Sequence, residues 1–111
     1  MKHNYNQPPC AEHQQQHLSR IYRRVLWQLK NTHALHKELA WELDDVEYSL
    51  RSLRGQQDGP TDRLLEREIT LLERRRATLE DRVLRELLRI DELTARVETT
   101  RHALTRSGCW N

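Results

Sequence analysis

The sequence predicts an all-α fold, an antiparallel coiled-coil hairpin of two long helices. Two observations lead to this prediction. Apolar residues recur in alternating steps of four and three in both halves of the chain, and Gly and Pro occur only near the ends and in one short central break. A narrow apolar stripe needs another helix to cover it, because one such helix is marginal in water. We further expect two hairpins to assemble into a four-helix bundle.

The first predicted helix spans residues 10–54 and follows a flexible tail of residues 1–9. Neither Gly nor Pro interrupts it, and Gly55 is expected to end it in a left-handed cap conformation. Its alternating spacing defines a seam that faces the second helix. This first seam consists of Leu18, Tyr22, Val25, Leu29, Thr32, His36, Leu39, Leu43, Val46, Leu50 and Leu53.

A connector of residues 55–61, closed by Gly59 and Pro60, separates the two helices. Thr61 is the predicted N-cap of a second helix over residues 62–107, and residues 108–111 form a C-terminal tail. The second seam consists of Leu65, Ile69, Leu72, Arg76, Leu79, Val83, Glu86, Ile90, Leu93, Val97, Thr100 and Leu104. A connector of this length favours folding the second helix back along the first.

Placing Leu53 opposite Leu65 fixes the register of the hairpin and places Leu39 opposite Leu79. In this register, polar Thr32 lies opposite polar Glu86. The polar seam residues are expected to set the register, because a slip of one turn would bury Glu86 against an apolar residue. Arg76 lies beside Leu43 and is expected to reach Glu42 or Glu73. The register-setting residues are therefore Thr32, which meets Glu86, together with His36 and Arg76.

The composition excludes several functional classes. The net charge is only +2, which argues against a general nucleic-acid binder. No apolar run approaches the roughly 20 residues of a membrane span. The N-terminus has no signal-like apolar region, so we expect an intracellular protein of the cytoplasm or nucleus. Two paired helices offer no cleft to desolvate catalytic carboxylates, so we expect neither an enzyme nor a cofactor.

The outer side of the first helix carries an aromatic face. Trp27, Ala34, Trp41 and Tyr48 recur every seven residues, and Ile21, Leu26 and Leu35 broaden the stripe. One interpretation is scattered surface aromatics, which are common. We favour a second docking face, because Trp and Tyr anchor many interfaces. The second helix adds a smaller outer patch of Leu84, Leu87 and Leu88.

Cysteines and histidines converge at the open end of the predicted hairpin. Cys10 falls level with Cys109, and His17 falls level with His102. His13 lies between Cys10 and His17 in the sequence. Ordinary solvated residues are the favoured interpretation. A small zinc-stabilised module is an alternative, because zinc accepts Cys and His ligands. A disulfide between the two cysteines is a third, in an oxidising setting.

The stretch from Leu79 to Leu93 contains an acidic pair that begins with Glu80, the double leucine Leu87-Leu88, and Asp91. It resembles the second helix of BAG domains, three-helix modules that regulate heat-shock chaperones. The resemblance implies a co-chaperone, with Glu80 and Asp91 on the chaperone-facing side. That family's third helix would have to begin within residues 96–106, and no break follows Asp91 to start it.

The favoured function is a non-catalytic coiled-coil interaction or scaffold subunit. It would self-associate as a homodimer or dock a helix of a partner protein. The expected partner-binding residues are Trp27, Trp41, Tyr48, Leu26, Leu35, Leu84 and Leu88.

Overall fold

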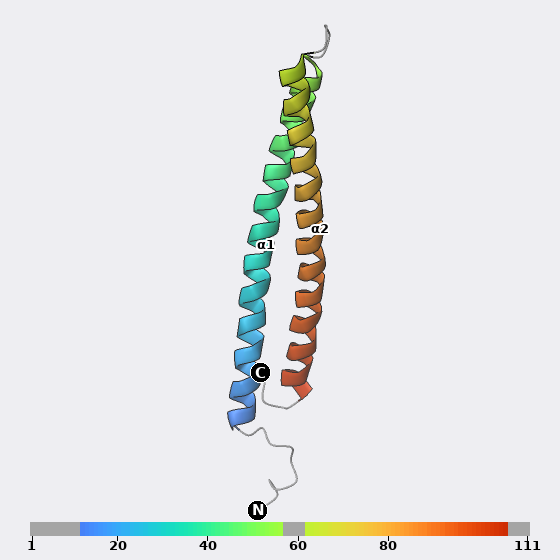
Figure 1. Ribbon diagram of the computed structural model, residues 1–111. Helices are drawn as coiled ribbons and strands as arrows, with labels where there is room; N and C mark the ends of the chain where they lie inside the picture. Colours follow the sequence, from blue (N-terminus) through green and yellow to red (C-terminus); the bar gives the residue numbers. More distant parts are fainter. Residues whose placement is uncertain (1–11, 57–61, 107–111) are drawn as a thin grey trace, which may run out of the picture. The chain divides into compact units, whose positions relative to one another are not determined.

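The computed structural model describes residues 12–56 and 62–106. These residues form two helices, α1 (Glu12–Arg54) and α2 (Arg63–Arg106), and no strand occurs among them. The predicted all-α helical hairpin is therefore confirmed, and Figure 1 shows α1 in blue to green and α2 in yellow to red. The predicted helix ends at residues 10 and 107 lie outside the described residues.

The helix ends that border the connector are capped differently from what we predicted. The Gly55 amide donates to the Arg51 carbonyl at 3.0 Å, but Gly55 does not adopt the left-handed backbone that we expected. The cap of α2 is Asp62, whose carboxylate accepts a hydrogen bond from the Leu64 amide at 3.0 Å. Thr61, the predicted cap, lies outside the described residues.

The chain divides into two compact units, each containing a segment of both helices. Of the described residues, the connector unit comprises 33–56 and 62–88, and the terminal unit comprises 12–32 and 89–106. In the connector unit the core is built by leucines, isoleucine and valines of the two seams. Its buried members are Leu39, Val46, Leu50, Ile69 and Leu79, packed against Leu43, Leu53, Leu65, Leu72 and Val83.

The terminal unit also has five buried apolar residues among those described, and three of them form one cluster. Val25 on α1 packs with Leu93 and Val97 on α2, and the partly buried members are Ile21, Tyr22 and Leu29. Ile21 therefore belongs to the core side of α1, which corrects its predicted place in the outer stripe. It lies just beside the seam, where a helix packed against a partner also buries side chains.

The seams predicted from spacing are the buried stripes of both helices. Every seam residue is buried or half-buried, and the only other residue of α2 that is not exposed is Ala103. Leu39 and Leu79, which we expected to face each other, share one core cluster. Thr32 belongs to the terminal unit and Glu86 to the connector unit, so their pairing stays a prediction.

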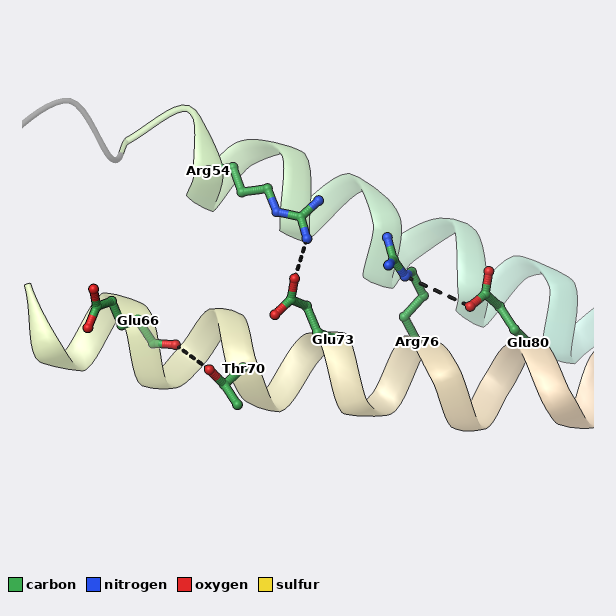
Figure 2. A network of polar contacts seen from close by, with 6 residues as sticks. All are labelled: Arg54, Glu66, Thr70, Glu73, Arg76 and Glu80. Carbon is green, nitrogen blue, oxygen red and sulfur yellow. Dashed lines mark hydrogen bonds and ion pairs between the residues drawn. The ribbon is translucent and has the colours of Figure 1, made fainter. Parts of the chain in front are cut away.

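Ion pairs join the flanks of α1 and α2 in the connector unit. Arg54 of α1 reaches Glu73 of α2 at 2.5 Å, as Figure 2 shows, and Glu42 of α1 pairs with Arg75 of α2. All four side chains are about half exposed, so each pair contributes about 0.2–1 kcal/mol. These pairs are evidence for the antiparallel alignment, but they contribute little to its stability.

Arg76 does not use the predicted partners. Glu42 and Glu73 are taken by other arginines, and the Nε atom of Arg76 lies 3.9 Å from Glu80 on its own helix (Figure 2). This Nε atom is buried and has no hydrogen-bond partner in the described structure. Glu42 lies across the seam, and Glu80 competes well with it because residues four apart share one helix face. Glu73 lies on the same helix as Arg76 but pairs with Arg54.

Candidate protein-docking surfaces

The first candidate surface is the outer side of α1 in the connector unit. Trp41 is 61% exposed and Tyr48 is 69% exposed, as the predicted outer face requires. The Lys37 ammonium lies 5.1 Å from the centre of the Trp41 ring, close enough for a cation–π contact. Leu35, expected to broaden this face, is 37% exposed, about as much as Leu26 in the terminal unit.

Two carboxylates separate the aromatic side chains of this surface. Asp44 and Asp45 are exposed, and one helical turn separates them from both Trp41 and Tyr48. Neither carboxylate makes an ion pair with another described residue. We call Trp41, Asp44, Asp45 and Tyr48 the α1 face. It is an apolar surface with an acidic centre.

The terminal unit has its own exposed apolar residues on α1. Trp27 is 67% exposed, and its carbonyl accepts a hydrogen bond from the Asn31 side chain at 3.0 Å. Leu26 is exposed beside it. The exposure of both residues fits their predicted role, which stays a prediction.

Helix α2 exposes more leucines than we expected. Leu84, Leu87 and Leu88 form the predicted patch and are all exposed. Leu64 and Leu71 are also exposed, and sequence reasoning missed them. Each precedes a seam leucine directly, and only one member of such a doublet can face the core, because neighbouring helical residues point in different directions. The two leucine doublets in the sequence could therefore have predicted that Leu64 and Leu71 are exposed.

Two shallow grooves lie on this part of the connector unit. One is lined by Leu64, Arg67, Glu68 and Leu71, all on α2. The other lies between the helices and is lined by Tyr48, Ser49, Ser52, Leu53, Glu68 and Leu72. Glu68 borders both grooves, so they adjoin.

The predicted register-setting residues occupy the interior of their units. Thr32 is buried, and its hydroxyl donates to the Gln28 carbonyl at 2.8 Å. His36, Arg76 and Glu86 are half-buried. Their positions agree with the predicted seams.

No metal centre appears among the described residues. No group of three His, Cys, Asp or Glu side chains there is arranged to hold an ion. His17 and His102 are both exposed. Cys10, Cys109 and the side chain of His13 lie outside what the structure describes, so the zinc and disulfide alternatives stay predictions.

Within residues 12–56 and 62–106, no helix has the length and apolar character needed to cross a membrane. Glu80 and Asp91, which the BAG resemblance places on a chaperone-facing side, are both exposed. No protein-family model, curated protein or solved structure matches this chain, so the resemblance to BAG domains stays a prediction.

Proposed function

We propose that this chain is a non-catalytic helical interaction subunit, and that its α1 face docks a helix of another protein. The observation that carries the proposal is the pair of exposed aromatic residues, Trp41 and Tyr48, on the side of α1 away from the core. Two large aromatics at this spacing form a ready anchor for a partner, because burial of each would contribute about 1.5–3 kcal/mol.

The acidic centre of the α1 face specifies the chemistry of the partner. Asp44 and Asp45 carry charges that no described residue of this chain neutralises. A partner helix with apolar side chains flanking Lys or Arg residues would cover the aromatics and pair with both carboxylates. A partner with an acidic helix would be rejected by like-charge repulsion.

The same charges argue against two α1 faces pairing with each other. An antiparallel pair of α1 faces would place Asp44 of one copy against Asp45 of the other. Such a contact repels twice in a symmetric dimer. The α1 face therefore favours a different protein over a second copy.

The test is affinity purification of the full chain from cell extract with quantitative comparison of variants. Trp41→Ser/Tyr48→Ser should reduce recovery of a specific partner by roughly 30-fold, because central aromatic anchors dominate binding energy. Asp44→Lys/Asp45→Lys should reduce it as well. Retention of the partner by both double variants would contradict the proposal.

Asp91→Lys/Glu92→Lys is the matched charge control, because it changes the net charge equally at an adjacent acidic pair on α2. It should leave recovery of the partner unchanged. Loss of a heat-shock chaperone on changing Glu80 or Asp91, with the α1 face intact, would support the BAG-like alternative instead.

A further inference from the structure

Helix α2 carries a second surface that the α1 face does not use. Leu64, Arg67, Glu68 and Leu71 line one groove, and their spacing places them on one side of the helix. We call these four residues the α2 groove. Leu64 is 76% exposed and Leu71 is 54% exposed, so the two leucines form an uncovered apolar pair about 10 Å apart along the helix.

The charges at the centre of the α2 groove have no partner within the described chain. Arg67 and Glu68 make no ion pair, whereas the nearby Glu73 and Arg75 each pair with a residue of α1. One positive and one negative side chain are thus exposed between two exposed leucines. Along the helix the order is leucine, arginine, glutamate, leucine. A second copy running in the opposite direction therefore places leucine opposite leucine and arginine opposite glutamate.

We propose that the α2 groove pairs with the α2 groove of a second copy of this chain, in an antiparallel arrangement with two-fold symmetry. The midpoint between residues 67 and 68 is also the midpoint between residues 64 and 71. A two-fold axis there places Leu64 opposite Leu71 of the second copy and Arg67 opposite Glu68 of the second copy. Symmetry repeats both contacts, as an isologous interface requires.

The arrangement of charges selects this geometry over the others. A parallel pairing would place Arg67 against Arg67 and Glu68 against Glu68 of the second copy, which repels. The α1 face has the same residue spacing, but two aspartates occupy its centre. The α2 groove is therefore the surface whose charges attract a second copy, and the α1 face is the one whose charges oppose it.

The expected dimer is weak. Two leucine pairs and two exposed ion pairs bury less surface than a stable interface does. The adjoining groove beside Tyr48 and Ser52 shares Glu68 with the α2 groove and extends the area available to the second copy. Association should therefore depend on concentration and weaken as salt screens the ion pairs.

Sedimentation equilibrium of the full chain, from about 10 μM to about 1 mM, measures the dissociation constant. Arg67→Glu alone places two glutamates opposite each other, and Glu68→Arg alone places two arginines opposite each other. Each single change should weaken the dimer roughly tenfold, because the repulsion occurs twice. The double variant Arg67→Glu/Glu68→Arg restores opposite charges and should restore the dimer.

Arg82→Glu is the matched control, because Arg82 is exposed on α2 outside the groove and makes no ion pair with a described residue. It should leave the dissociation constant unchanged. All variants alter exposed positions, and circular dichroism verifies that each stays helical.

A monomer at every concentration would overturn the proposal, as would a dimer that ignores both single reversals. A double variant that fails to recover would overturn the antiparallel register. The dimer is independent of the proposed function, because Trp41→Ser alone should reduce recovery of the partner and leave the dimer intact, since Trp41 lines neither groove.

Discussion

At the scale of single residues, Arg76 occupies a position of α2 that costs stability. It lies at a core-facing seam position, yet its Nε atom is buried without a hydrogen bond and its carboxylate neighbour Glu80 is 3.9 Å away. An unsatisfied buried donor costs roughly 1–3 kcal/mol. We expect Arg76 to contribute to register instead, because a polar side chain in a seam disfavours slipped alignments.

Replacing Arg76 by leucine should stabilise the hairpin. Arg76→Leu removes the orphaned donor and adds apolar surface to the seam, so we expect the free energy of unfolding to rise by about 1 kcal/mol. Urea denaturation measures the change. Arg75→Leu is the control and should lower stability slightly, because Arg75 is exposed and pairs with Glu42. A less stable Arg76→Leu variant would show that the seam needs the charge.

At the scale of elements, the two helices hold together through one narrow seam. Leu50 is 1% exposed and belongs to the larger core cluster. Leu84, on the outer side of α2, contacts solvent instead. The same residue type thus has two different energetic roles in one hairpin, and its position relative to the seam decides between them.

Leu50→Ala should lower the free energy of unfolding by about 2–5 kcal/mol, through lost burial and the cavity left behind. Leu84→Ala should change it by no more than about 0.5 kcal/mol. Chemical denaturation of both variants at one dilute protein concentration makes the comparison. Equal effects at the two positions would contradict the assignment of the seam.

The flanking ion pairs allow a second test at the element scale. A double-mutant cycle on Glu42 and Arg75 should give a coupling free energy of about 0.2–1 kcal/mol, because solvent screens two side chains that are about half exposed. The coupling should fall as salt is added. Zero coupling at low salt would mean that this contact does not form in solution.

At the scale of the whole molecule, the two units differ in the hydrogen bonding along α2. Each unit has five buried apolar residues among those described, although only three of the five in the terminal unit form one cluster. The α2 segment of the terminal unit also contains four threonines whose hydroxyls donate to carbonyls four residues earlier. They are Thr94, Thr99, Thr100 and Thr105. Such bonds compete with regular helix geometry.

Native-state hydrogen exchange should therefore show the terminal unit opening first. Amides of residues 99–106 should exchange at least about tenfold faster than amides around Leu79, because threonine hydroxyls in this segment compete for the helix carbonyls. Thr99→Ala/Thr105→Ala should slow the exchange of its neighbours, because alanine has a higher helix propensity. Uniform protection along α2 would contradict this gradient.

Spacing alone predicted the seams, because the helical repeat ties burial to residue number. Spacing was less informative for side chains that border the seam, and for charged side chains with more than one partner within reach. Ile21 borders the seam and packs into the core, and Arg76 lies near Glu80 instead of the predicted Glu42 or Glu73. Gly55 proved compatible with an ordinary helical end, since a Cβ there would meet its nearest atoms at 3.5 Å. Such choices depend on side-chain geometry, which periodicity does not encode.

The α1 face and the α2 groove lie on different helices of one unit, which has a consequence for binding strength. A two-fold pair of chains joined through α2 would present two aromatic faces at once. A partner with two helices could then engage both, and the second contact would form at a high effective concentration. Modest affinity at each face would thereby become strong avidity, regulated by the amount of this protein present.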